Sequence, residues 1–107
     1  MASKTTEAPV LDLLTSMTGN SIEASSLDAE TLMLVRIAAL VAVDAPPASY
    51  LMNLGIAREL DIDVEQVRGV LAAVAPIVGT ARVASAMTKI VRALELELEL
   101  SELDAEV

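Results

Sequence analysis

Five polar side chains in and just after the most apolar run of this sequence are its candidates for chemistry. They are Arg36, Asp44, Ser49, Tyr50 and Asn53. A guanidinium binds a carboxylate through two parallel hydrogen bonds, so Arg36 could hold the carboxylate of a small acid. The other four side chains cluster within residues 44–53 and offer hydrogen-bond donors and acceptors. If this region forms a pocket, these five side chains are its candidate lining.

Each candidate also has an ordinary structural interpretation, and the sequence leaves both open. Arg36 would pair with an acidic residue on a neighbouring helix or subunit, because a buried arginine is rarely left unpaired. Asp44 would cap a helix, and Tyr50 would pack with its hydroxyl in solvent. Ser49 and Asn53 would satisfy backbone groups or water.

The residue types that are missing exclude several kinds of chemistry. The chain has no cysteine and no histidine. Disulfides, thiol redox chemistry and thiolate metal sites are thereby excluded, and the usual general base is absent. We expect no cofactor and no metal ion. The net charge of −9, from 16 acidic and 7 basic residues, argues against binding to nucleic acid or to an anionic membrane.

Two further groups of residues have a functional and a structural interpretation. Met33, Met52 and Met87 could line a ligand cavity, but methionine at helical spacing is more often core filling. The acidic stretch at residues 95–106 could bind a cation. It lacks the Asp, Asn and Gly pattern of a calcium loop, which favours a solvated face.

The chain is more apolar than a soluble monomer of its length should be. Of its 107 residues, 54% are hydrophobic, and the mean hydropathy is +0.59. A membrane-spanning helix needs about 18 or more apolar residues in a row, whereas the longest run, residues 32–43, is shorter and contains Arg36. We therefore expect no membrane partner and a homo-oligomer whose copies share apolar surface. The first residues carry no apolar leader, which predicts a cytoplasmic protein.

Helix signals punctuate the chain and predict an all-α fold of about five helices. We expect a disordered segment at residues 1–8, a single compact helical domain at 9–100 and an acidic tail at 101–107. Gly19 and Asn20 should end a first helix that runs over residues 9–17. Asp28 can cap a second helix reaching about Val43, and Pro47 can open a third that reaches about residue 60.

The last two helices have clear signals of their own. Asp63 with Gln66 three residues later forms a capping box, and Gly79 ends that helix after a bend at Pro76. Thr80 can cap a long final helix. The expected apolar face of the fourth helix comprises Val64, Val67, Leu71, Val74 and Val78. The expected apolar face of the last helix comprises Val83, Met87, Ile90, Val91, Leu94 and Leu98.

Residues 94–100 alternate leucine and glutamate, which by period alone is a strand pattern. Both residue types are strong helix formers and poor strand formers, which favours continuation of the helix. The leucines of this segment then form either an oligomer contact or a frayed, solvated tail. We favour the contact, because water would otherwise face a row of leucines.

The order and spacing of these elements resemble a known family. The matching features are Ser26-Leu-Asp before an apolar helix with Ala38-Ala39, the break at Asp44-Ala45-Pro46, the helix with Ala57, and a glycine at Gly79. Asp61-Ile-Asp-Val-Glu-Gln-Val is similar to the family pattern Gly-Val-Thr-x-Glu-Glu-Ile. From residue 26 to about 94 the chain resembles the carboxymuconolactone decarboxylase superfamily, which includes the alkylhydroperoxidase D-like proteins. The resemblance implies a compact helical fold that assembles into trimers or hexamers.

The resemblance also shows which family positions are substituted. The redox branch carries Cys-x-x-Cys-x-x-x-His, and in that register this chain has Pro46, Ser49 and Asn53, with Leu34 near the glutamate of the proton relay. Thiol peroxidase activity is therefore not expected. The decarboxylase branch resembles Pro-x-x-x-Leu-x-x-His. Pro46 matches it, Leu51 is one position off, and Asn53 replaces the histidine and cannot act as a general acid.

Two hypotheses follow. In the first, the chain is a non-redox oligomer of this fold that binds, or slowly transforms by a lyase-type reaction, a small apolar or carboxylate-bearing molecule. In the second, it is a structural, self-assembling relative that has lost catalytic activity.

Overall fold

A computed structural model describes the backbone of residues 8–106 and the side chains of residues 8–96 and 99. Every regular element in the described part of the chain is an α-helix, which confirms the all-α expectation. The five helices are α2 (Pro9–Ala24), α3 (Ala29–Ala42), α4 (Pro47–Glu59), α5 (Val64–Val78) and α6 (Thr80–Glu106). The disordered segment expected at residues 1–8 lies, except for Ala8, outside the described residues.

Local signals set most of the helix ends. The Asp28 side chain accepts a hydrogen bond from the Thr31 N–H at 2.8 Å and caps α3. Asp63 and Gln66 form the reciprocal capping box of α5. Gly79 follows α5 with a φ of 92°, a conformation that glycine adopts without steric cost.

The first helix is longer than the sequence predicts. The expectation that it ends at Gly19 and Asn20 is wrong, because α2 continues through both to Ala24. A glycine inside a helix costs only about 1 kcal/mol relative to alanine, and here that cost does not break the helix. The last turn closes instead where the Ser25 N–H donates to the Ser21 carbonyl.

Residues 94–100 are helical, as residue propensity predicts, and α6 runs without a break to Glu106. The helix therefore continues past residue 100, where we expect the domain to end and the acidic tail to begin. That domain boundary remains a prediction. No helix within the described range is long and apolar enough to cross a membrane.

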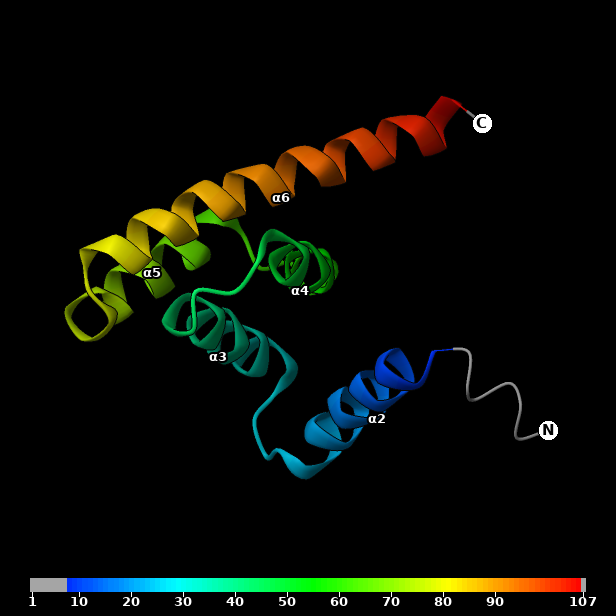
Figure 1. The fold of residues 1–107 in the computed structure, drawn as a ribbon, viewed down its shortest axis with the longest axis horizontal. Coiled ribbons are helices and arrows are strands. Elements are labelled where there is room, and N and C mark those ends of the chain that lie inside the picture. The colour runs from blue at the N-terminus through cyan, green and yellow to red at the C-terminus, as the bar shows by residue number, and fades with distance from the viewer. Residues whose placement is uncertain (1–7, 107) are drawn as a thin grey trace.

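The helices α3, α4, α5 and α6 pack into one core, with α3 in contact with each of the other three. Figure 1 shows α6 lying across the molecule, with α4 and α5 against it and α3 on their far side. Ile37 and Val41 of α3 are completely buried, as expected for the most apolar helix. The face of α6 that enters the core includes Val83, Ile90 and Leu94 of the expected apolar face but leaves Met87 and Val91 exposed. It buries Ala86, Ile90 and Ala93, because the small alanines allow α6 to approach its neighbours closely.

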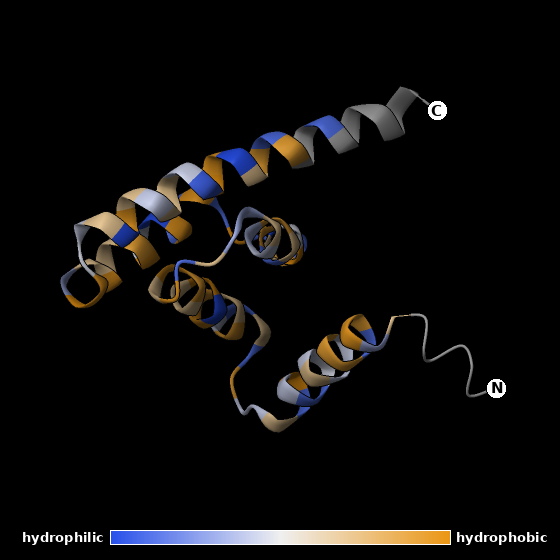
Figure 2. Cartoon of the chain, in the orientation of Figure 1, coloured by the Kyte–Doolittle hydropathy of each residue, from blue (hydrophilic) through white to orange (hydrophobic). Residues whose placement is uncertain are grey.

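Helix α2 stands apart from this core. It has no buried residue and is missing from the main helix pairs. Figure 1 shows it beyond α3 and α4 from α6, and Figure 2 shows apolar residues along it. A helix with large apolar side chains and no burial lacks a packing partner for them among the residues that the structure describes.

Candidate functional site

The polar side chains with the most cross-helix contacts meet at the short connection between α3 and α4. The Asp44 N–H donates to the Val41 carbonyl at 3.2 Å, and the Ala45 N–H donates to the Leu40 carbonyl at 3.0 Å. This tight turn places Asp44 at a φ of 55°, in the left-handed region that aspartate tolerates better than most residues. Asp44 does not cap a helix, contrary to its structural interpretation, since Pro46 occupies the N-cap of α4.

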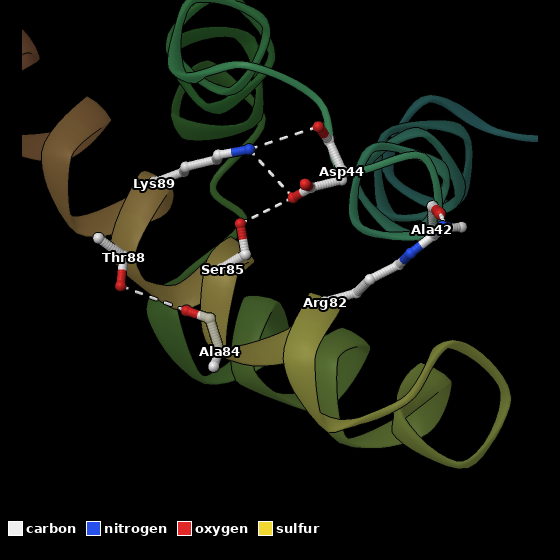
Figure 3. A network of polar contacts seen from close by, with 7 residues as sticks. All are labelled: Ala42, Asp44, Arg82, Ala84, Ser85, Thr88 and Lys89. Carbon is white, nitrogen blue, oxygen red and sulfur yellow. Dashed lines mark hydrogen bonds and ion pairs between the residues drawn. The ribbon is translucent and has the colours of Figure 1, made fainter.

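Helix α6 supplies the partners of Asp44. The Ser85 hydroxyl donates to Asp44 Oδ1 at 2.7 Å. The Lys89 ammonium donates to the same oxygen at 3.0 Å and to the Asp44 carbonyl at 3.3 Å. Figure 3 shows both side chains directed at Asp44 from one face of α6. Because Ser85 and then Lys89 stabilise the ionised form, they hold the pKa of the Asp44 carboxyl below its ordinary value.

One turn earlier on the same face, Arg82 donates to the Ala42 carbonyl at the end of α3. A cation at a helix C-terminus interacts favourably with the helix dipole. Arg82, Ser85 and Lys89 follow the i, i+3, i+7 spacing of one helix face. Together they fasten the connection between α3 and α4 to α6, and we call Asp44, Arg82, Ser85 and Lys89 the loop cluster.

Tyr50 lies in the first turns of α4, directly after this connection. Its side chain is fully buried, and within the described structure its hydroxyl is the buried side-chain atom that has no hydrogen-bond partner. The expectation that the hydroxyl lies in solvent is therefore wrong, because α4 turns this side chain into the core. Burial raises the pKa of the Tyr50 hydroxyl above its ordinary value, and the negative charge of Asp44 raises it further.

Arg36 does not join the loop cluster. Its guanidinium donates to the Thr18 carbonyl at 3.4 Å and to the Ser21 hydroxyl at 3.1 Å, both on α2. The ion pair expected from its structural interpretation does not form among the residues that the structure describes, because Arg36 faces uncharged groups of α2. Arg36 therefore attaches α2 to α3.

Ser49 and Asn53 make local contacts within α4. The Asn53 amide donates to the Ser49 carbonyl at 2.8 Å, and the Ser49 N–H donates to the Pro46 carbonyl at 3.1 Å. Of the five predicted pocket residues, Asp44 and Tyr50 are thus coupled through the charge of Asp44, Ser49 and Asn53 are neighbours on α4, and Arg36 contacts α2.

Sequence reasoning missed Arg82, Ser85 and Lys89. The signal that could have found them is their i, i+3, i+7 spacing on a helix whose buried face consists of small and apolar residues. With Asp44, the two cations leave the loop cluster one positive charge in excess in a chain of net charge −9. This local excess suits an anion.

Two surface hollows lie away from the loop cluster. One is a groove between α5 and α6, and another, bounded by Leu32 and Ile56, lies where α2 meets α3 and α4. Within the described part of the chain, no group of three or more acidic residues is arranged to hold a metal ion.

Comparison with known proteins gives one match. The sequence model described as the carboxymuconolactone decarboxylase family matches residues 8–92. No curated protein and no solved structure matches the chain. The matched range includes α2, the connection between α3 and α4, and the α6 face that carries the loop cluster.

Proposed function

Because the chain belongs to the carboxymuconolactone decarboxylase family, we propose that it is a non-redox, homo-oligomeric member that binds a small carboxylate-bearing molecule at the loop cluster. The observation that carries the binding site is the pair of α6 cations, Arg82 and Lys89, at the connection between α3 and α4. The chain has no cysteine, so it has no thiolate for peroxide chemistry.

The chemistry of the cluster supports binding more directly than catalysis. Arg82 and Lys89 offer donors to a carboxylate, and Asp44 fixes Lys89 in position. Decarboxylation requires a proton for the carbon that loses CO₂, and the family histidine position holds Asn53, which does not titrate near neutrality. A lyase-type reaction here would therefore be slow.

The homo-oligomeric part of the proposal rests on exposed apolar side chains. Large hydrophobic residues stay exposed on α2 and along parts of α3, α4, α5 and α6. Exposed apolar surface on this scale marks an interaction site in soluble proteins. Trimers or hexamers are proposed by analogy with the family.

Titration calorimetry with carboxymuconolactone and with the matched pair succinate and succinamide tests the binding site. Carboxymuconolactone and succinate should bind the wild-type protein, whereas succinamide, which has no carboxylate, should not. Arg82→Gln and Lys89→Gln should each weaken binding about tenfold, the effect of one lost charged hydrogen bond. Arg68→Gln is the control, because Arg68 lies on α5, away from the loop cluster, and pairs there with Glu65. Binding that ignores both α6 substitutions would refute the site.

A purely structural role is the second candidate, favoured by a specific observation. Every polar group of the loop cluster already has a partner within the chain, and Tyr50 is packed without an opening to solvent. If no carboxylate probe binds while multi-angle light scattering finds an oligomer, self-assembly is the function that remains. A monomer at micromolar concentration would refute both candidates.

A further inference from the structure

Helix α2 carries one apolar stripe that no part of the described structure covers. Val10, Leu13, Leu14 and Met17 recur at i, i+3, i+4 and i+7, the spacing of a single helix face. Their exposed fractions lie between 51% and 66%. The opposite face carries Asp12, Ser16, Gly19 and Glu23. A helix with this division of faces is built to pack its stripe against another apolar surface.

A groove between α5 and α6 presents such a surface. Its lining on α5 begins at Val64 and on α6 at Met87, and each wall follows the same i, i+3, i+4, i+7 spacing, to Leu71 and to Leu94. Ile90 lies buried in the groove, whereas Met87 and Val91 are 55% and 56% exposed. The exposed side chains of the α6 wall thus belong to the apolar face that the sequence predicts for this helix.

Stripe and groove agree in length and in polarity. Each of the three faces extends over eight residues, whose ends lie about 10 Å apart along a helix. The charged residue in the groove lining is Arg68, which pairs with Glu65 on its own helix at 2.7 Å. Because this charge is paired, the groove has an almost uncharged lining that suits an apolar stripe. A third helix lying in the groove would form a small three-helix core with α5 and α6.

The groove lies out of reach of the α2 helix of the same chain. Arg36 holds Thr18 and Ser21 of α2 against α3. In Figure 1, α3 and α4 lie between α2 and α6. The stripe must therefore meet the groove of another molecule.

We propose that the apolar stripe of α2 of one protomer docks into the α5–α6 groove of a second copy, and that α2 of the second copy docks into the groove of the first. This inference rests on the homo-oligomer of the proposed function and names the surfaces that form it. The occupant is a second copy because both complementary surfaces belong to one sequence, and reciprocal exchange gives a closed, two-fold contact.

The area supports reciprocal exchange over a single contact. The four stripe side chains contain 15 carbon and sulfur atoms of about 30 Å² each and are a little more than half exposed, so one stripe presents about 250 Å². Two stripes and two grooves together bury about 1,000 Å², which is the lower limit for a specific interface. One stripe in one groove would bury about half of that and would not suffice.

Cysteine cross-linking tests the contact directly, because the chain has no cysteine of its own. Chains of Leu13→Cys and Val91→Cys, carrying different tags, are co-expressed and treated with a short bismaleimide. We expect a cross-linked product that contains both tags. Ser16→Cys with Val91→Cys is the matched control, since Ser16 lies on the polar face of α2, and its yield should be several-fold lower. As a second variant, Leu13→Asp should shift the light-scattering mass towards the monomer.

The outcomes separate this inference from the proposed function. A wild-type monomer would refute both. An oligomer in which the Leu13 and Ser16 pairs cross-link equally, or in which neither does, would refute the exchange of α2 and leave the homo-oligomer intact. Flotation of the wild-type protein with phosphatidylglycerol vesicles, abolished by Leu13→Asp, would show that a membrane takes the stripe and would also refute the exchange.

Discussion

The Nζ atom of Lys89 lies 3.0 Å from Oδ1 of Asp44, a residue 45 positions earlier in the sequence. The carboxylate that it meets belongs to a residue with a φ of 55°. Ser85 donates to the same oxygen at 2.7 Å. The contact therefore stabilises an unfavourable backbone conformation and joins the entrance of α4 to α6.

A double-mutant cycle of Asp44→Asn and Lys89→Gln should show that these two side chains are coupled. Asparagine keeps the tolerance for positive φ but removes the charge, so each single variant should lower Tm by a few degrees and the double variant by less than the sum. The coupling should weaken at high salt, because both side chains are partly exposed. The exposed pair of Glu65 and Arg68 is the control and should show almost no coupling. Additive single effects would contradict the prediction.

The lowered pKa of the Asp44 carboxyl predicts a loss of stability in acid. The group is ionised more readily in the folded chain than in the unfolded one. Its contribution is therefore fully present above the ordinary pKa of 3.8 and disappears as pH falls through the lowered value. Urea unfolding at pH values from 6 to about 2.5 should show a smaller acid-side decrease for Asp44→Asn than for the wild type. Equal pH slopes for the two proteins would contradict the lowered pKa.

Tyr50 can be titrated without interference, because it is the single aromatic residue of the chain. Absorbance at about 295 nm should give a midpoint above the ordinary pKa of 10.0, since burial and then Asp44 oppose ionisation. The folded chain holds this proton more tightly than the unfolded one. The stabilisation is thus present below pH 10 and is lost as pH rises towards the folded pKa. Asp44→Asn should lower the midpoint by less than burial raised it. A midpoint at or below 10.0 would show that solvent reaches the hydroxyl.

The helices could be predicted largely because their end signals act within one turn. The capping box of Asp63 and Gln66 and the positive φ at Gly79 are local, and both are readable from residue types. The face of α6 that enters the core was not readable, since it depends on which helices lie beside it. Ala86 and Ala93 meet α4 and its neighbours closely, and the larger Met87 and Val91 lie on the adjacent, exposed face.

Only part of the site could be predicted, because its contacts also depend on which helices lie side by side. Asp44 and Tyr50 stand beside the apolar run and were identified from that position. Ser85 and Lys89 join Asp44 from more than 40 residues away, so no local pattern links them. The structural interpretation of Arg36 predicts an acidic partner, but Arg36 contacts Thr18 and Ser21 of α2 instead. Both partners lie in the part of α2 that the sequence prediction places beyond the end of the helix.

Replacing Tyr50 by phenylalanine should leave the isolated domain as stable or about 1 kcal/mol more stable, because the buried hydroxyl lacks a partner and its desolvation is no longer required. Far-UV circular dichroism must follow the urea transition, since the variant has no other fluorophore. Tyr50→Leu is the control for the ring itself and should cost about 2 kcal/mol or more. A loss of stability above about 1 kcal/mol in Tyr50→Phe would mean that the hydroxyl does have a hydrogen-bond partner.

Two glycines, each changed to alanine, should give opposite results. Gly19 lies inside α2 with open space around its Cα, so alanine should stabilise the helix by about 0.5–1 kcal/mol. Gly79 also has open space, but its φ of 92° is unfavourable for any residue with a Cβ, so alanine should cost about 1–2 kcal/mol. Helix content by circular dichroism and urea unfolding measure both effects. Destabilisation by Gly19→Ala would indicate that α2 ends at Gly19 and Asn20 after all. An unchanged stability in Gly79→Ala would contradict the positive φ of Gly79 between α5 and α6.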